Sequence, residues 1–211
     1  MEPFYRNMRR KHHILMDKGT PAGGKWNFDQ SNRSRYDGSV PIPSPKVFAN
    51  NVTAIVRMVK NAGIDTTGKI QPEHFIWPVN RRQACQMRDE FVTSRLPCFG
   101  TYQDAMTTES WSLFHSRLSF ALNTKMLHPM EVINAALQSA FSGGEPRAGI
   151  EQIEGFVRQI LGWREFMRGI YWHHMPEYEN MNFFSHTSAL PDYYWTGKTQ
   201  MACRSEEHTS E

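Results

Sequence analysis

The sequence predicts an all-α protein built from packed helices of ordinary length. Apolar residues recur at the helical period in several segments, and no segment shows the alternation that is typical of a half-buried strand. Residues that favour helix boundaries flank these segments, including Pro129 in a first turn and Gly63 after a last turn. Of the 211 residues, 39% are hydrophobic and 21% are charged, as in globular proteins that bury a core.

The first expected element is a short basic helix within residues 1–19. Residues 20–45 follow it and are dense in Gly, Pro, Asn, Asp and Ser, which predicts a loop or linker. Basic and aromatic side chains are interleaved along this linker: Lys25, Trp26, Phe28, Arg33, Arg35 and Tyr36. Two interpretations remain open, because such a linker can contact a nucleic acid or can pack its aromatic rings on the body of the protein.

Five longer helices are expected after the linker. They cover residues 47–62, 81–95, 110–120, 129–141 and 154–176. The first has its apolar residues on one face and stops at Gly63. The second is expected to end at Leu96-Pro97, because proline disrupts a helix interior, and the fourth ends at Gly143-Gly144.

The last of these helices carries glycines spaced seven residues apart, at Gly155, Gly162 and Gly169. Each glycine costs about 1 kcal/mol relative to alanine, and the spacing places all three on one face. We therefore expect a neighbouring backbone or a flat ligand against that face. Trp163 and Arg164 lie on the same helix, where they could stack on a ring and hold an anion.

A second candidate site lies at residues 115–119, which read HSRLS. Two hydroxyls and a guanidinium near a helix end can bind a phosphate, although helix capping explains such residues as well. Arg164 and Arg168 could complete an anion site. Alternatively, Arg168 forms an ion pair with Glu165 on a solvated face.

The composition excludes several classes of protein. There is no apolar run of about 18 residues for a membrane span, and the basic N-terminus lacks the apolar core of a secretory signal. Cys85, Cys98 and Cys203 form no C-x-x-C pair, so neither a disulfide framework nor a self-contained zinc site is expected. A cytoplasmic protein without a membrane partner or an obligate protein partner is expected.

Six motifs resemble one family in the order in which they occur. GFVRQILGWREFMRGIYW resembles the W-R-E-F helix of DNA photolyases and cryptochromes. HSRLSFALNTKMLHPMEV resembles their flavin-phosphate motif, with His115 in place of Thr and Phe120 in place of Pro. FYRNMRR, GGKWNFDQSNR, LPCFGTYQDAM and YYWTGKTQMAC resemble the prokaryotic photolyase-related branch that carries an iron–sulfur cluster. The resemblance covers nearly all of residues 1–203.

The resemblance implies a U-shaped FAD and a site for UV-damaged DNA. The residues that it implies for FAD are Tyr102, Ser116, Leu118, Ser119 and Arg164. Trp163 would stack on a flipped pyrimidine lesion, and Trp195 resembles a tryptophan of the electron-transfer route. Cys203 matches the first of four thiolate ligands of a [4Fe–4S] cluster. Ile160 replaces a Glu or Gln that contacts the lesion in many photolyases, which favours the (6-4) photoproduct over the pyrimidine dimer.

The resemblance also implies a fragment of a longer parent. The N-terminal α/β domain with its antenna chromophore and the remaining cluster cysteines are not in the sequence. Residues 204–211 match a translated sequencing-adapter sequence and are expected to be a non-native tail. The expected organisation is therefore an N-terminal helix and linker at 1–44, a partial helical FAD-binding domain at 45–203 and the tail.

The expected activity of the parent is light-driven repair of pyrimidine photoproducts by electron transfer from FAD. Two alternatives remain at this stage: a cryptochrome-type blue-light receptor without repair activity, or an inert fragment that lacks half of its flavin site. A generic helical nucleic-acid-binding module is more distant.

Overall fold

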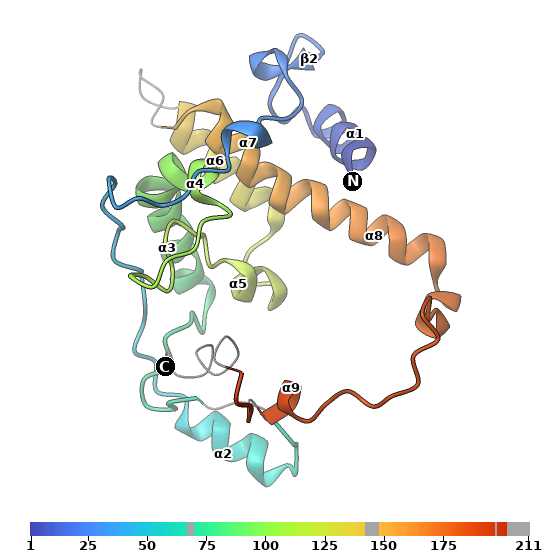
Figure 1. Ribbon diagram of the computed structural model, residues 1–211. Helices are drawn as coiled ribbons and strands as arrows, with labels where there is room; N and C mark the ends of the chain where they lie inside the picture. Colours follow the sequence, from blue (N-terminus) through green and yellow to red (C-terminus); the bar gives the residue numbers. More distant parts are fainter. Residues whose placement is uncertain (67–69, 142–147, 197, 202–211) are drawn as a thin grey trace. The chain divides into compact units, whose positions relative to one another are not determined.

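The computed structural model describes residues 1–66, 70–141, 148–196 and 198–201 (Figure 1). Its contacts divide the chain into two compact units, each formed by two segments of sequence. The first unit comprises Met1–Val47 and Pro78–Pro176, and the second comprises Phe48–Trp77 and Glu177–Glu211. The domain boundaries expected from the sequence, at residues 44 and 203, stay a prediction.

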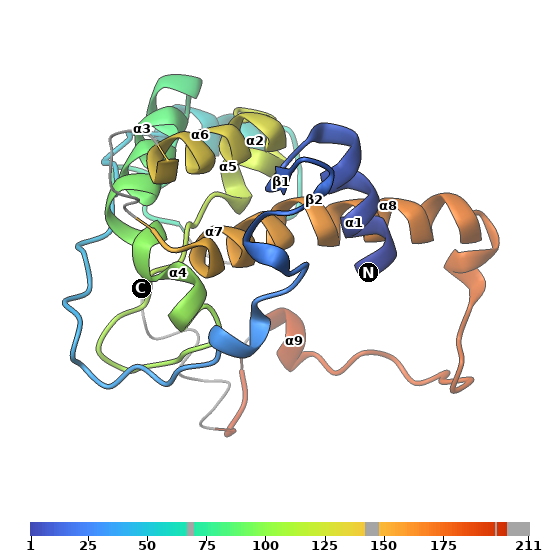
Figure 2. The ribbon, with the colours of Figure 1, turned by 90° about the horizontal axis from the view of Figure 1, so that it is seen from above.

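The first unit is helical, which confirms the all-α prediction. Its α-helices are α1 (Glu2–His12), α3 (Arg81–Glu90), α4 (Leu96–Tyr102), α5 (Ser119–Asn123), α6 (Pro129–Phe141), α7 (Ile150–Val157) and α8 (Trp163–His174). A π-helical turn, η3 (Phe91–Arg95), joins α3 to α4, and a second, η4 (Arg158–Gly162), joins α7 to α8. Figure 2 shows α7 and α8 as one nearly continuous rod that α1 crosses.

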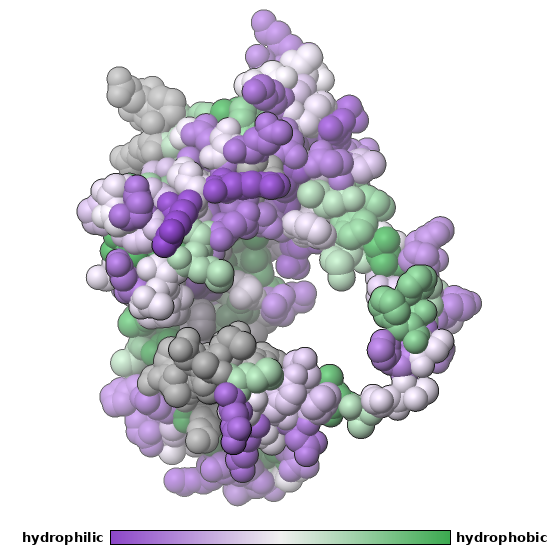
Figure 3. Space-filling model, viewed as in Figure 1, coloured by the Kyte–Doolittle hydropathy of each residue, from purple (hydrophilic) through white to green (hydrophobic). Residues whose placement is uncertain are grey.

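Between α1 and the linker, the chain forms a two-stranded antiparallel ribbon of β1 (Met16–Asp17) and β2 (Thr20–Pro21). Two short 3-10 turns follow, at η1 (Ala22–Gly24) and η2 (Asp29–Ser31). The surface over α1 and this ribbon is largely hydrophilic (Figure 3). In the described part of the chain, none of the helices is long and apolar enough to span a bilayer.

The core forms where α4 packs on α7. Phe91 stacks at a tilt on Phe156 with ring centroids 4.6 Å apart, and Phe99 meets the same ring edge-on at 5.4 Å. All three rings are buried, and aromatic pairs of this geometry add to the stabilisation from burial. The core therefore holds α7, which continues through η4 into the helix of Trp163, against α4.

The glycine face of the 154–176 segment is covered by protein. A Cβ on Gly155 would meet Asn32 Nδ2 at 2.9 Å, and one on Gly162 would meet Met1 Sδ at 3.0 Å. A Cβ on Gly169 would collide with the ring of Phe4. Of the two interpretations, close packing of protein groups is thus the one that the structure supports.

Two helix predictions are wrong. The helix from residue 81 does not end at Leu96-Pro97 but continues to Tyr102, since the π turn precedes Pro97 and places it in the first turn of α4. Residues 110–118 form a loop rather than a helix. Leu113 and Arg117 adopt φ angles of 39° and 53°, which no α-helix contains.

Other boundaries differ less. The 129–141 helix is confirmed as α6, and the glycines expected to stop it, Gly143 and Gly144, lie outside the described residues. The segment expected at 154–176 begins earlier, at Ile150, and its last α-helical residue is His174.

In the second unit, α2 (Thr53–Asn61) replaces the expected 47–62 helix, because the chain before it is extended. Asn50 pairs with Phe75 in an isolated antiparallel bridge, and its Nδ2 donates to the carbonyl of Trp77 at 2.8 Å. Gly63 adopts a φ of 66° just beyond the helix, as expected of a helix stop. A 3-10 turn, η5 (Glu177–Asn180), and the short α9 (Tyr193–Thr196) complete this unit.

Candidate functional site

The HSRLS segment lies in a constrained loop that leads into α5. At its start, Ser110 Oγ accepts hydrogen bonds from the backbone N–H groups of Ser112 and Leu113, at 3.2 and 3.1 Å. At its end, Ser116 Oγ accepts a long bond of 3.5 Å from the N–H of Leu118, which is buried. Ser119 is exposed at the first position of α5. The assignment of Ser116, Leu118 and Ser119 to a phosphate site stays a prediction.

Two arginines lie at this loop, since Arg117 is part of it and the guanidinium of Arg95 donates to the carbonyl of Leu113. Burial lowers the pKa of Arg117, and the charge of Arg95 lowers it further, partly offset by Glu90. Burial and the charge of Arg95 also lower the pKa of His115, against a smaller opposing effect of Asp104. Cations that raise one another's energy in a partly desolvated place favour a bound anion. The lowered pKa leaves His115 neutral at neutral pH, so the positive charge near the hydroxyls of Ser116 and Ser119 comes from the arginines.

His115 gives the first testable prediction. Its folded-state pKa is below its unfolded value of 6.5, so its contribution to stability is present above about pH 6.5 and is lost as pH falls below it. We expect His115→Gln to lose less stability than the wild type between pH 7.5 and 5.5, as measured by urea unfolding. His128→Gln, on the exposed start of α6, is the control. An equal pH dependence of stability in wild type and His115→Gln would contradict the lowered pKa of His115.

Tyr102, which the resemblance assigns to the flavin, is packed inside the protein. Its ring stacks on Phe114 with centroids 5.2 Å apart and meets Tyr36 edge-on at 5.6 Å. The hydroxyl of Tyr36 donates to the carbonyl of Val40 at 2.8 Å. Of the two linker interpretations, packing on the body therefore holds for Tyr36. It also holds for Trp26, whose ring has the guanidinium of Arg10 at 4.8 Å.

Trp163 borders a cavity of about 520 Å³ that is also lined by Glu2, Asn27, Gln103, Asp104 and Arg158. The indole is 45% exposed and contacts Phe166 edge-on at 5.8 Å. An aromatic face beside amide and carboxylate groups suits a planar ring with hydrogen-bonding edges. A smaller cavity of about 460 Å³ lies beyond Asp104, where Arg33 and Arg35 contribute to its lining.

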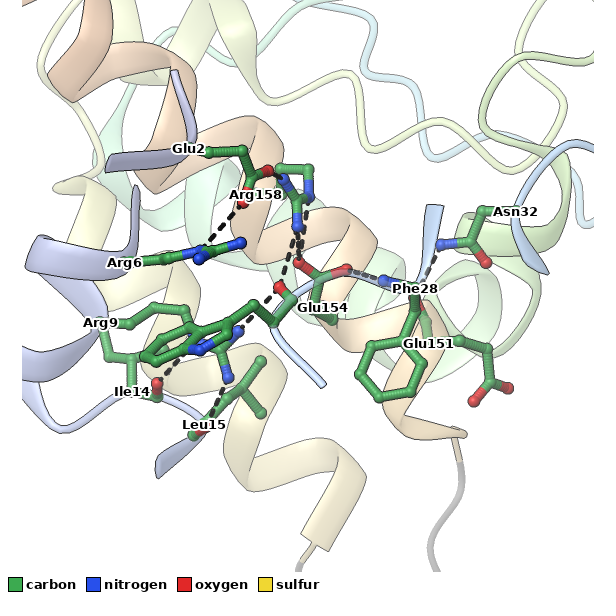
Figure 4. Close-up of polar contacts among 11 residues, drawn as sticks. Glu2, Arg6, Arg9, Ile14, Leu15, Phe28, Asn32, Glu151, Glu154 and Arg158 are labelled. Atoms are coloured by element: carbon green, nitrogen blue, oxygen red, sulfur yellow. Dashed lines mark hydrogen bonds and ion pairs between the residues drawn. The ribbon is translucent and has the colours of Figure 1, made fainter. Parts of the chain in front are cut away.

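An ionic network joins Arg158 and Glu2, which line the larger cavity, to the buried Glu154 (Figure 4). The guanidinium of Arg158 donates to Glu154 Oε1 at 3.0 and 2.6 Å and is also paired with Glu2. Glu154 Oε2 accepts the backbone N–H of Phe28 at 3.1 Å. Burial, with the charge of Glu154 as the next cause, raises the pKa of Tyr5.

The same network holds the segment that follows α1. Arg9 is fully buried and donates to the carbonyls of Ile14 and Trp26, each at 3.2 Å, while Arg158 donates to Trp26 at 3.0 Å. Sequence reasoning missed this network, although Glu154 and Arg158 have the i,i+4 spacing of a helical ion pair. The burial that makes the pair important comes from α1, which lies far away in sequence.

The remaining predicted residues are dispersed. Arg164 is exposed, and no hydrogen bond or ion pair within the described ranges joins it to residues 115–119. Arg168 pairs with Glu165 at 2.9 Å, as the ion-pair alternative expects. Trp195 is 62% exposed in α9 of the second unit. Cys203, the expected cluster ligand, and the expected tail lie outside the described residues.

No three His, Cys, Asp or Glu side chains gather as a metal site in the part of the chain that the structure describes. Cys85 and Cys98 are free thiols, and burial raises the pKa of Cys98. A [4Fe–4S] cluster needs thiolate ligands that converge. The described residues hold no such set of thiolates, and the predicted cluster ligand, Cys203, lies outside them.

Comparison with known proteins gives one family. Residues 1–75 match the family described as "Deoxyribodipyrimidine photo-lyase-related protein". Over 205 residues, or 96% of this chain, the sequence is 42% identical to a (6-4) photolyase of Agrobacterium fabrum and spans 39% of its length. An uncharacterized protein of Acanthamoeba polyphaga mimivirus is 26% identical over 98 residues, which is 46% of this chain and 73% of that protein.

Proposed function

We propose that this chain, which is similar to deoxyribodipyrimidine photolyase-related proteins, is a member of their family and forms the flavin-binding part of a light-dependent enzyme that repairs ultraviolet photoproducts in DNA. The observation that carries this proposal is the 42% identity, over 96% of this chain, to a (6-4) photolyase, together with the hydroxyls of Ser116 and Ser119 in one loop. That similarity and Ile160 favour the (6-4) photoproduct as the lesion. Two free thiols among the described residues suit the cytoplasm.

In this proposal the loop binds the diphosphate of FAD. Ser116 and Ser119 supply hydroxyls, Arg117 supplies positive charge in a place where water is partly excluded, and His115, neutral because its pKa is lowered, can donate a hydrogen bond. Leu118 anchors the loop in the core, and Arg164 lies on the exposed face of α8. When bound, the reduced flavin supplies a light-excited electron donor, which is the chemistry that side chains alone do not provide.

The cavity beside Trp163 takes the flipped pyrimidine in this proposal. The indole offers a stacking face, and Asn27, Gln103 and Asp104 offer hydrogen-bonding groups for the edge of a base. A damaged, poorly stacked step is the easiest to unstack, which contributes to selectivity. The chain thereby orients the lesion and excludes water from one of its faces.

The most direct test measures photoproduct in DNA with a protein that contains this chain. We expect loss of (6-4) photoproduct under blue light and none in the dark. Light-induced flavin reduction without any loss of photoproduct would contradict repair and favour the receptor alternative. Absence of stoichiometric flavin from that protein would contradict the flavin assignment itself, and stoichiometric FAD on the 211-residue chain alone would contradict the inert-fragment alternative.

Trp163 gives a second prediction. We expect Trp163→Ala to weaken binding to photoproduct-containing DNA by about 5- to 150-fold, because stacking of a base on an aromatic ring is worth about 1–3 kcal/mol. Trp163→Phe should recover most of the affinity. The control is Trp172→Ala, which removes an indole that is 71% exposed on the same helix. Fluorescence anisotropy with damaged and undamaged duplexes measures the effect, and equal losses in both alanine variants would contradict the assignment.

A further inference from the structure

Arg95 connects two segments that are far apart in sequence. Its guanidinium donates to the carbonyl of Pro43 in the linker at 2.7 Å and to the carbonyl of Leu113 in the loop. It also reaches Ser112 Oγ at 3.5 Å, and its Nε donates to Glu90 at 2.9 Å. The side chain is 0% exposed, so its charge is held inside the protein by these partners.

The loop that Arg95 holds has a backbone that needs a restraint. Leu113 adopts a φ of 39° and Arg117 a φ of 53°, and such left-handed conformations are unfavourable for residues with a side chain. Arg95 binds the carbonyl of the first of them. At the other end, Arg117 donates to the carbonyl of Lys46 at 2.7 Å and lies over the ring of Trp111 at 4.9 Å. Residues 114–116 are therefore fixed from both sides.

We propose that Arg95 is a positioning residue for an anion site at residues 115–119: it holds the loop in its phosphate-binding conformation and adds positive charge without touching the ligand. This rests on the proposed function only for the identity of the ligand, a diphosphate. Because Arg95 is fully buried, it acts through Leu113 and not by direct contact. Lysine would keep the charge at this position, but it lacks the planar fork that serves acceptors in several directions at once.

The test uses the 211-residue chain with inorganic pyrophosphate as the probe. We expect pyrophosphate to shift the backbone amide resonances of residues 115–119, and Arg95→Lys to weaken this binding at least about tenfold, as loss of a charge-assisted hydrogen bond would. The matched control is Arg88→Lys, which changes an arginine paired with Asp89 and Glu131 on the preceding helix. Circular dichroism checks that each variant is folded.

A second readout separates positioning from general stability. The imidazole of His115 should titrate nearer its ordinary pKa in Arg95→Met, where the charge is gone, than in Arg95→Lys, where it remains. Equal pyrophosphate binding by wild type and Arg95→Lys would overturn the proposal, and so would failure of the wild type to bind pyrophosphate. Pyrophosphate binding without FAD binding would instead contradict the proposed function and leave the anion site intact.

Discussion

Replacing Glu154 by glutamine is expected to destabilise the first unit by about 3–5 kcal/mol, the usual result of leaving one member of a buried ion pair without its partner. Glu154 is 0% exposed, and Arg158, which donates to it twice, is almost as deeply buried. The loss also weakens the bond from the N–H of Phe28. Glu2 remains beside Arg158, which favours the lower part of the range. Urea unfolding at neutral pH measures the change.

Two further variants make this result specific. Glu165→Gln removes a carboxylate from the solvated Glu165–Arg168 pair and should change the stability far less. Glu154→Leu combined with Arg158→Met replaces the buried pair by apolar groups and should recover much of the lost stability. If Glu154→Gln lowers the free energy of unfolding no more than Glu165→Gln does, the buried pair does not contribute the stability expected of it.

Gly100→Ala is expected to destabilise the same unit by about 3 kcal/mol, the upper part of the range for overpacking. A Cβ at this position would lie 2.8 Å from the Cα of Gln152 and 2.9 Å from the carbonyl oxygen of Glu151. Both are backbone atoms, so α4 and α7 must move apart for the methyl group to fit. The gain of about 1 kcal/mol in helix propensity offsets only part of this cost. Thermal and urea unfolding both measure the loss.

Gly162→Ala is the matched control, again a glycine in a helical segment that faces a neighbouring helix. Its Cβ would meet the tip of the Met1 side chain at 3.0 Å and the Tyr5 ring at 3.2 Å. The Met1 side chain can rotate away, so we expect a change within about 1 kcal/mol of zero. A loss for Gly162→Ala as large as that for Gly100→Ala would show that backbone proximity is not the cause.

The fold could be predicted where local sequence preferences decide the backbone, and could not where contacts with distant segments override them. The 129–141 helix was predictable because Pro129 starts it and apolar residues follow at helical spacing. The loop at residues 110–118 was not predictable, because its apolar residues also have helical spacing and so indicated a helix. In the structure, Arg95 binds the carbonyl of Leu113, and Leu113 lies in the left-handed region, where a helix cannot continue. No sequence pattern predicts this contact between Arg95 and Leu113.

The candidate site divides in the same way. The hydroxyls of Ser116 and Ser119 and the indole of Trp163 were found because they form a local motif. Arg95 and Glu154 were missed, since their importance arises from burial by segments that lie elsewhere in the sequence. An isolated arginine on a predicted helix is usually a solvated residue. Only the packing shows that these two residues organise the loops around them.

The ionic network changes the mechanical character of the segment between α1 and Phe28. By composition it is an extensible tether, yet the carbonyls of Ile14 and Trp26 and the N–H of Phe28 are bound to Arg9, Arg158 and Glu154. A pulling force applied at Met1 would therefore load these ionic bonds before the segment could stretch. The segment between α1 and Phe28 is therefore stiff. Tension applied at Met1 would be transmitted through it to Glu154 and Arg158, and so to α7 and η4.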